Sequence, residues 1–436
     1  MKISKNGVVQ FLLTVGYCIV YILCYLKFLY PIFEYAGFTL FNTSLFVLVW
    51  STLIATFPII FHKGYKAISS FITIFIFVLV YVPFIITFGI GYNAPILKII
   101  WIQLVFMGCM ILLFYADRFT IKPSVKFQIS TNKDITNAIF KTVLVITIIS
   151  TLFIIYMYKD NLRFVAFGEE VYELRAENMK FATGIITRYL SSWLSVVFIP
   201  ICLVYGLMYR NRLFFILACI SCLIIYMATA SKGVILFPVI FLAFYLLFKK
   251  VSLKNIYSKF VFALTTGLLM LLYVPTFSHS VFMAKSIVMW RVVGNGGYLT
   301  MWYYDFFSTN PYTYYSHIGI VNAITGAYSY DAPLGFVIGR KWNPLMNANA
   351  NFWATDGIAA MGILGVIVIT LLFFFVLAFF NSATKNINTL FALLLMIPFI
   401  YSILNVSLFS SLLTGGGFFI LLFFMILSSN INITQK

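Results

Sequence analysis

The hydrophobic residues of the chain form long continuous runs, and short polar segments separate one run from the next. A bilayer core of roughly 30 Å needs about 20 residues of α-helix, which is the length of these runs. Because polar and apolar positions do not alternate within the runs, they predict transmembrane helices and not barrel strands. The twelve predicted spans cover residues 8–30, 39–61, 68–90, 96–116, 138–157, 188–208, 213–230, 233–248, 260–276, 357–380, 389–409 and 411–429.

The interval 158–187, which follows the fifth span, is polar but has its own pattern. Four apolar residues recur in it at three-to-four-residue spacing: Val171, Leu174, Phe181 and Ile185. Acidic residues such as Glu169 lie on the other side. This pattern predicts a short amphipathic helix that lies on the membrane surface.

The interval 277–355, between the ninth and tenth spans, is the only long polar stretch in the chain. It holds two of the three histidines and a high density of Tyr, Trp, Asn and Gly. We expect it to form a long loop at one membrane face and to carry the functional residues. The fold class predicted for residues 1–436 is therefore an all-α polytopic membrane protein, a single integral membrane domain with about twelve spans.

Composition agrees with this prediction. The hydrophobic fraction is 63%, and only 9% of the 436 residues are charged, which excludes a water-soluble domain. The net charge of +18 does not indicate nucleic-acid binding, because the cations lie in the short turns between spans. If Lys2 and Lys5 are cytoplasmic, most of the Lys and Arg residues fall on the inside, together with only two acids, Asp117 and Asp134. This asymmetry predicts cytoplasmic termini and an outer location for residues 158–187 and 277–355.

Several kinds of chemistry have no support in the sequence. There is no Asp-x-Asp pair, no phosphate-binding glycine loop, no Gly-x-Ser-x-Gly motif and no cluster of His, Cys and carboxylates. The six cysteines lie in apolar spans without metal-ligand spacing and are expected to be core residues. We therefore expect chemistry without a metal or cofactor, carried by cations, hydroxyls, amides and one or two acids.

Cations on the predicted outer side are candidates for binding a lipid diphosphate, since they run against the topology bias. A guanidinium group matches phosphate oxygens with a planar fork of donors. Binding of ordinary lipid headgroups is the alternative interpretation. The candidates are Arg188, Lys232, Arg291, Arg340 and Lys341.

Candidates for proton transfer are few. His317 and His279 are possible general bases, because histidine titrates near neutrality, although a single loop histidine can equally be structural. Asp356 begins the tenth span, where it would either cap the helix or orient a hydroxyl or an arginine. Tyr303 belongs to a dense aromatic group that suits both a membrane-interface belt and stacking on sugar rings.

The motifs around Arg291 resemble those of the bacterial O-antigen polymerase (Wzy) family. They comprise Arg291, Gly-Gly-Tyr-Leu-Thr (296–300), Tyr303, Phe306-Phe307, Pro311, Ser316-His317, Pro333-Leu334-Gly335, Ile338-Gly339, Asn349-Ala350-Asn351, Asp356-Gly357, Gly362 and Gly365. Upstream, Thr-Ala-Ser-Lys (229–232) is similar to the Thr-Ala-Ser-Arg element of the family, with Lys232 in place of the arginine.

This resemblance implies a multi-pass inner-membrane enzyme of Gram-negative bacteria with a GT-C-type fold. Such enzymes join oligosaccharide repeat units carried on undecaprenyl diphosphate at the periplasmic face, with flippase and chain-length regulator as partners. It implies that Arg291 and Arg188, with Arg340, bind the diphosphate and that His317 or Asp356 acts on the acceptor hydroxyl. Tyr303 and the run that contains Asn347, Asn349 and Asn351 would line the sugar site.

Two other activities are compatible with about twelve spans. A flippase would need polar residues along a central cavity, but the spans offer only Lys27 and Lys98, both off centre. An O-antigen ligase would use the same donor with a different acceptor, and the local motifs favour the polymerase. A non-enzymatic membrane assembly factor is the remaining alternative.

Overall fold

The computed structural model describes residues 5–121, 133–166, 170–178, 180, 184–343 and 346–430. Over these residues the chain is helical and contains no strand. It forms two compact units, where the sequence predicted one domain. The first unit comprises Met1–Ile121, Leu253–Ala378 and Ile403–Phe409, and the second comprises Lys122–Ser252, Phe379–Ser402 and Ser410–Lys436.

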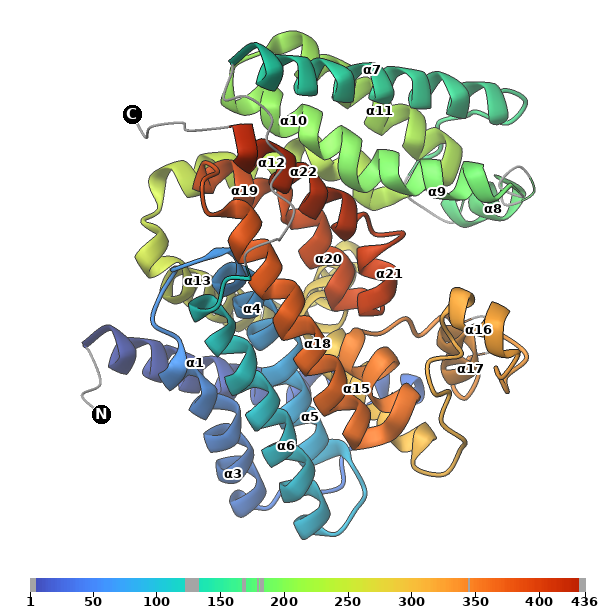
Figure 1. Ribbon diagram of the computed structural model, residues 1–436. Coiled ribbons are helices and arrows are strands. Elements are labelled where there is room, and N and C mark those ends of the chain that lie inside the picture. The colour runs from blue at the N-terminus through green and yellow to red at the C-terminus, as the bar shows by residue number, and fades with distance from the viewer. Residues whose placement is uncertain are drawn as a thin grey trace. The chain divides into compact units, whose positions relative to one another are not determined.

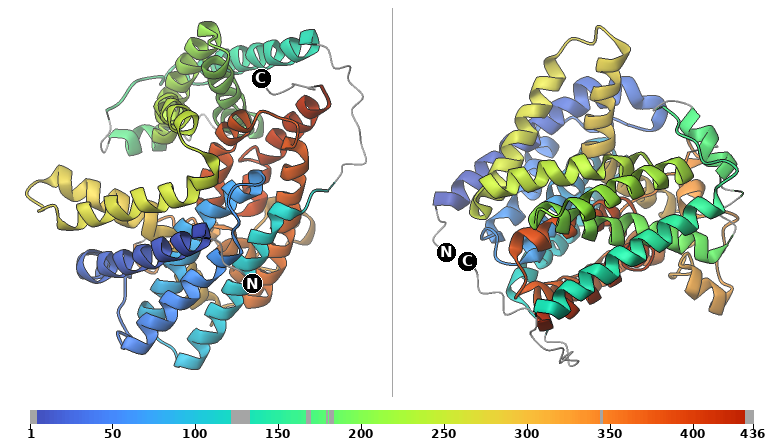
Figure 2. Two further views of the ribbon diagram at one scale, coloured as in Figure 1. Left: turned by 90° about the vertical axis from the view of Figure 1, so that its left-hand side faces the viewer. Right: turned by 90° about the horizontal axis from the view of Figure 1, so that it is seen from above.

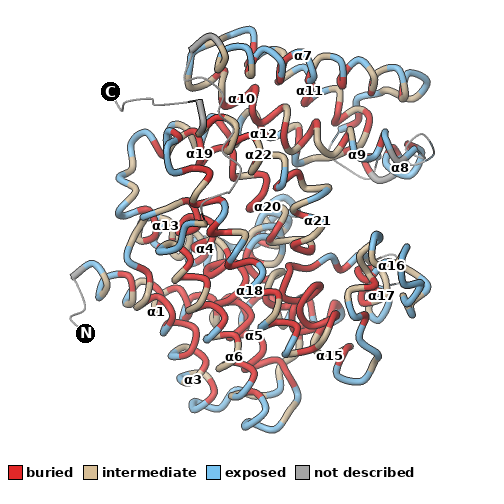
Figure 3. The backbone as a smooth tube through the Cα atoms, viewed as in Figure 1, coloured by how far each residue is buried: buried red, intermediate tan, exposed pale blue. Residues whose placement is uncertain are grey.

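The first unit is built around one continuous helical stretch. It runs from α4 (Ile68–Ile76) through a π-helical turn, η4 (Phe77–Tyr81), into α5 (Val82–Gly91). Nearly all of this stretch is buried (Figure 3). Helices α3 (Leu45–Thr56) and α6 (Ile96–Tyr115) lie beside α5 (Figure 1). Farther along the unit, α1 (Lys5–Cys24) and α13 (Ile256–Tyr273) run side by side (Figure 2).

The second unit is a bundle of apolar helices. Its helices α7, α10 and α11 pack against one another, and α12 packs against α10, α11 and α19. The bounds are α7 (Lys133–Met157), α10 (Ile199–Met208), α11 (Arg212–Thr229), α12 (Lys232–Lys250), α19 (Thr389–Leu395) and α22 (Gly417–Asn430).

The predicted spans coincide with apolar helices. Within the described residues, nine helices are long and apolar enough to cross a membrane, and Leu45–Phe61, Thr389–Asn405 and Gly417–Ser428 are shorter apolar helices. Each of the twelve predicted spans overlaps one of these. Many large apolar side chains on them point outward, for example Leu97 and Trp101 on α6 and Ile149 on α7. Such surfaces suit a lipid environment, so the prediction of an α-helical, multi-pass membrane protein is confirmed.

The interval 277–355 differs from the long loop that the sequence predicted, because much of it is helical. It contains α14 (His279–Lys285), the π-helix η9 (Ser286–Gly294), α15 (Asn295–Phe307), α16 (Gly319–Thr325) and α17 (Leu334–Gly339). Helix α15 packs against α5 and η4, and seven consecutive residues, 297–303, are buried. Gly296 and Gly297 permit this packing, since a Cβ at either would collide with the backbone of η4 or α5. The prediction of a loop is therefore wrong for α15.

The interval 158–187 also differs from its prediction. It contains two helices, α8 (Glu170–Asn178) and α9 (Ile185–Trp193). Val171 and Leu174 are fully buried against Tyr226 of α11 and Ala230 of the turn that follows it, so these two apolar residues of α8 pack on protein. The expected positions of Glu169 and Phe181 and of the Ile185 side chain lie outside the described residues.

Candidate active site

His317 and Asp356 form a hydrogen-bonded pair in the first unit. The Nε2 atom of His317 lies 3.2 Å from Oδ1 of Asp356. The Asp356 side chain is fully buried, and the His317 side chain is 7% exposed. A carboxylate that fixes one ring nitrogen of a histidine leaves the other nitrogen to exchange protons, which is the arrangement of a general base and its orienting group. The sequence named the two residues as alternatives, and the structure brings them together.

Backbone amides hold Asp356 in place. Asp356 lies in the π-helix η10 (Trp353–Ala359). Its second oxygen, Oδ2, accepts a hydrogen bond from the Leu408 amide, and the Phe409 amide also donates to this carboxylate. Both amides begin the short helix α21 (Leu408–Leu412). Charge-assisted bonds of this kind orient a buried carboxylate strongly, so Asp356 can hold His317 in one orientation.

A break in the tenth predicted span positions His317. Helix α18 (Ala360–Thr384) departs from helical geometry at Met361 and Gly362, where φ of Gly362 is +62°. In a regular helix the carbonyls of Ala359 and Ala360 would accept from amides four residues later. Here they accept from the amides of Thr313 and Tyr314, at 2.8 and 3.0 Å. The turn that carries His317 is thereby fixed to the end of η10.

Thr313 contacts the other ring nitrogen of His317. Its Oγ1 lies 2.8 Å from Nδ1 of His317 and 3.1 Å from the Ala359 carbonyl oxygen. The hydroxyl has one proton, which it can donate either to the carbonyl or to Nδ1. His317 can therefore gain or lose a proton at Nδ1 while both side chains stay in place. The site shows that a hydroxyl group fits against Nδ1 at hydrogen-bonding distance.

Tyr315 places a phenol beside the pair. Its ring centroid is 6.3 Å from that of His317, and among the described residues its buried hydroxyl has no hydrogen-bond partner. Tyr314 and Tyr315 have φ angles of +46° and +66°, a left-handed conformation that is uncommon outside glycine. Burial, and then the Asp356 carboxylate, raise the pKa of the Tyr315 phenol. Strained backbone next to an unpartnered donor is typical of functional sites.

Arg291 lies on η9 and is exposed. Its guanidinium carbon lies 4.8 Å from the centroid of the Trp290 ring. No salt bridge to Arg291 occurs in the part of the chain that the structure describes. Arg291 thus offers a guanidinium group that no carboxylate of the described residues neutralises.

Arg340 and Lys341, in contrast, are paired with acids. Arg340 Nη1 donates to both oxygens of Asp331, at 2.9 and 2.7 Å, and this bond lowers the pKa of the Asp331 carboxyl. Lys341 Nζ lies 2.8 Å from Asp305 Oδ2. Both pairs are exposed, so a ligand phosphate would have to compete with a carboxylate for either cation.

Asn347 and Asn349 are exposed, and Ala348 and Ala350, which alternate with them along the chain, are buried. The side-chain oxygens of both asparagines lie against Gly335 of α17, where a Cβ would collide with them. The Ala348 amide donates to the Gly335 carbonyl at 2.8 Å. Both asparagines are therefore available at the surface, as a sugar-binding role requires.

Tyr303 and Asn351 have structural surroundings that do not fit the predicted sugar site. Tyr303 is fully buried and its hydroxyl donates to the Ala348 carbonyl at 3.3 Å. Asn351 is also fully buried; its amide donates to Gly296 O and Thr300 Oγ1, and its oxygen accepts from the first amides of η10. These hydrogen bonds join η10 to α15, so both residues hold the scaffold of the site.

Arg188 and Lys232 belong to the second unit. Arg188 is exposed on α9, and Lys232 is the first residue of α12. His279 begins α14 and is exposed. The structure thus brings His317 and Asp356 into contact, and Arg291, Arg340, Lys341 and the asparagines belong to the same unit.

The sequence did not point to Thr313 or to the Leu408 amide, and it indicated Tyr315 only as one member of the dense aromatic group. Thr313 precedes His317 by four residues, which is a weak signal within a helical or turn segment. The only sign of the Leu408 contact is the polar interruption Asn405-Val406-Ser407 between two apolar runs, and nothing in that stretch points to Asp356.

Comparison of the chain with known proteins yields no match: no family model, no curated protein and no solved structure matches it.

Proposed function

We propose that the protein is an O-antigen polymerase that joins undecaprenyl-diphosphate-linked oligosaccharide repeat units. The observation that carries this proposal is the buried His317–Asp356 pair, with a hydroxyl group already seated against Nδ1 of His317. A glycosyl transfer to a sugar needs a base for the acceptor hydroxyl and charge stabilisation for the diphosphate that leaves. The first unit supplies a base in His317 and a cation without a carboxylate partner among the described residues in Arg291.

In the proposed reaction, the acceptor hydroxyl takes the place of the Thr313 hydroxyl at Nδ1. Its oxygen attacks the anomeric carbon of the growing chain and its proton passes to Nδ1 of His317. The bond between that carbon and the diphosphate oxygen breaks, and the electron pair leaves with undecaprenyl diphosphate. Asp356 stabilises the imidazolium ion, and Arg291 neutralises the developing charge on the diphosphate. Because cations stabilise the leaving group, the proposed transfer needs no metal ion.

The proposed architecture is GT-C-like, with twelve spans in the bacterial inner membrane. The nine long and three shorter apolar helices of the described residues support that number. The distribution of Lys and Arg supports cytoplasmic termini, which would put residues 277–355 at the periplasmic face. A lipid-linked oligosaccharide is the substrate, and a flippase and a chain-length regulator are the expected partners.

Deletion of the gene tests the activity itself. Lipopolysaccharide extracted from the deletion strain should lose its ladder on a silver-stained gel and retain core with a single repeat unit. Loss of the single-unit band as well would contradict polymerase activity and would indicate a flippase or ligase. Complementation with His317→Gln should leave the single-unit pattern, and the matched His279→Gln variant should restore the ladder.

Arg291 and Arg340 of the first unit provide a second test. Arg291→Lys removes the fork geometry from a cation without a carboxylate partner, and we expect shorter chains and a fainter ladder. Arg340→Lys alters a cation that Asp331 already neutralises, and the ladder should change little. Equal ladders from the wild type and the Arg291→Lys variant would show that Arg291 does not stabilise the leaving group.

A further inference from the structure

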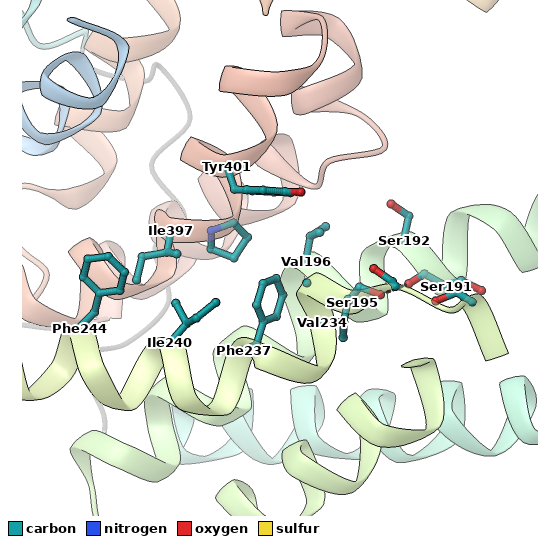
Figure 4. A pocket seen from close by; sticks show the side chains of 14 residues that line it. Ser191, Ser192, Ser195, Val196, Val234, Phe237, Ile240, Phe244, Ile397 and Tyr401 are labelled. Atoms are coloured by element: carbon teal, nitrogen blue, oxygen red, sulfur yellow. Dashed lines mark hydrogen bonds between the residues drawn. The ribbon is translucent and has the colours of Figure 1, made fainter. Parts of the chain in front are cut away.

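The second unit contains a cavity that the proposed transfer site does not use. Its volume is about 510 Å³, which lies in the range of ligand-binding pockets. Helices α9, α11, α12 and α20 (Ile397–Asn405) and the π-helix η7 (Leu194–Phe198) contribute to its wall (Figure 4). All fourteen lining residues belong to the second unit.

Polar and apolar residues separate along this cavity. Three serine side chains of α9 and η7 lie at one end, namely Ser191, Ser192 and Ser195 (Figure 4), and Thr229 and Ser231 also line the cavity. Ile240, Phe244 and Ile397 line the other end, and Phe237 and Tyr401 lie between (Figure 4). From Gly233 to Phe244 the cavity follows α12 for eleven residues, roughly 16 Å of helix. A long apolar floor with one polar end fits an amphiphile that lies along the helix.

Cations flank the polar end. Arg188 precedes Ser191, Ser192 and Ser195 by three, four and seven residues, the spacing of one helix face. Lys232 stands between the lining residues Ser231 and Gly233. No salt bridge to Arg188 occurs among the described residues. The charge at this end therefore suits an anionic headgroup.

Four of the hydroxyl groups that line the cavity already donate hydrogen bonds within the protein. Ser191, Ser195 and Thr229 each donate to a carbonyl of the preceding helical turn, and Ser192 donates to the Thr414 carbonyl. Phosphate oxygens need donors, and charged donors bind them more strongly than hydroxyls do, so we expect a phosphate to lie at Arg188 and Lys232. The part of the ligand that fills the cavity is then its hydrocarbon chain.

We propose that this cavity binds the hydrocarbon chain of a polyisoprenyl phosphate, whose phosphate lies at Arg188 and Lys232. Burial of the chain against Phe237, Ile240 and Phe244 provides the affinity, and the cations fix the orientation. The choice of an isoprenoid over an acyl chain rests on the function proposed above. The presence of a lipid-phosphate site does not.

The test measures binding to the purified full-length protein in detergent by native mass spectrometry, with polyprenyl phosphate as the probe. Ile240→Trp fills the cavity and should weaken binding by at least about tenfold. Val239→Trp is the matched control, because Val239 is the next residue of α12 and is 67% exposed. It should change binding by no more than about twofold.

Two further ligands, polyprenol and phosphatidic acid, and one further protein variant, Arg188→Gln, complete the test. The uncharged polyprenol should bind more weakly than polyprenyl phosphate, and Arg188→Gln should remove that difference. Equal binding of polyprenyl phosphate to the Ile240→Trp and Val239→Trp variants would overturn the proposed cavity. If polyprenol binds as tightly as polyprenyl phosphate, the proposed phosphate site is wrong. If phosphatidic acid binds as tightly as polyprenyl phosphate, the proposed preference for an isoprenoid chain is wrong.

This readout is independent of polymer formation. If deletion of the gene does not give the single-unit pattern, but Ile240→Trp still binds polyprenyl phosphate more weakly than Val239→Trp, polymerase activity is refuted and the lipid site is retained. A protein that passes the ladder test but shows no difference between these variants would refute the lipid site alone.

Discussion

At the scale of single residues, Asp356 has two functions that substitution can separate. It orients His317 and it satisfies the buried Leu408 amide. Asp356→Asn keeps an oxygen acceptor for that amide but removes the charge that stabilises an imidazolium ion. We expect the variant to fold and to lose transfer activity by at least about a hundredfold. The polymer ladder measures the activity, and a melting curve of the purified protein measures the stability.

Asp356→Ala is the comparison for that prediction. It leaves the Leu408 amide and the Nε2 atom of His317 without a partner in the protein interior, which costs on the order of 1–3 kcal/mol for each unsatisfied group. Its melting temperature should therefore fall below that of Asp356→Asn. If Asp356→Asn polymerises at the wild-type rate, the carboxylate charge has no part in the reaction.

Tyr315 offers a second separation of stability from function. Its buried hydroxyl has no partner among the described residues, so Tyr315→Phe removes an unsatisfied group and should raise the free energy of unfolding by about 1 kcal/mol. If the hydroxyl donates to the substrate, as we expect, the same variant polymerises more slowly. A melting curve and the ladder density test the two effects on one protein. An unchanged ladder would assign Tyr315 a packing role.

At the scale of helices, the break at Gly362 leaves the carbonyls of Ala359 and Ala360 free to accept hydrogen bonds from the turn that carries His317. Gly362 has a φ of +62°, and a Cβ there would lie 2.6 Å from the Tyr312 hydroxyl oxygen. Gly362→Ala should destabilise the protein by roughly 1–3 kcal/mol and reduce activity as well, because the carbonyls of Ala359 and Ala360 would shift. The melting temperature and the ladder report both effects.

Gly108→Ala is the matched control for the helix break. Gly108 lies inside α6, and no atom approaches within 4 Å of the position that its Cβ would take. Alanine in such a helical position should stabilise by up to about 1 kcal/mol. Equal melting temperatures for the two alanine variants would show that the left-handed geometry of Gly362 is not needed.

The membrane spans could be predicted from the sequence, whereas helix α15 could not. The spans depend on local apolar runs, so the predicted 68–90 and the observed Ile68–Gly91 agree almost completely. Helix α15 escaped because its buried face contains Thr300, Trp302 and Tyr303, which have the composition of a polar loop. Its burial depends on the contact of Gly297 with α5, about 200 residues earlier in the chain, and a linear pattern does not encode that contact.

The candidate site divides in the same way. His317 was identified by residue type, as one of two histidines in the interval 277–355, and Asp356 by its place at the start of the tenth predicted span. Their pairing was not identified, because it depends on a helix break at Gly362 and on an amide at Leu408. Neither feature has a local signature strong enough to connect residues 317, 356 and 408.

At the scale of the whole first unit, His62 joins distant parts of the chain. It lies between the predicted second and third spans, and its ring packs against Phe114 and Tyr257, with centroid distances of 5.4 and 5.6 Å. Its Nε2 is buried and has no hydrogen-bond partner among the described residues. Burial, and then the nearby Lys66, lower the pKa of His62 to about 4. The folded protein therefore keeps this histidine uncharged.

The consequence is a pH-dependent stability. The unfolded chain protonates His62 below its ordinary pKa of about 6.5, whereas the folded chain does so only near pH 4. Between these values the unfolded state binds the additional proton, so the free energy of unfolding falls as the pH falls, by up to about 3 kcal/mol in total. Above pH 7 both states are neutral at this residue, and His62 contributes no pH dependence.

His62→Gln should remove this dependence. Melting temperatures of the wild type and the variant, measured in the same detergent from pH 7.5 to pH 4.5, should converge or cross as the pH falls. Carboxylates elsewhere titrate equally in both proteins, so the difference between the two curves isolates His62. A difference that stays constant across this range would mean that water reaches the ring in the folded protein, and that the packing of residues 62, 114 and 257 is looser than the structure indicates.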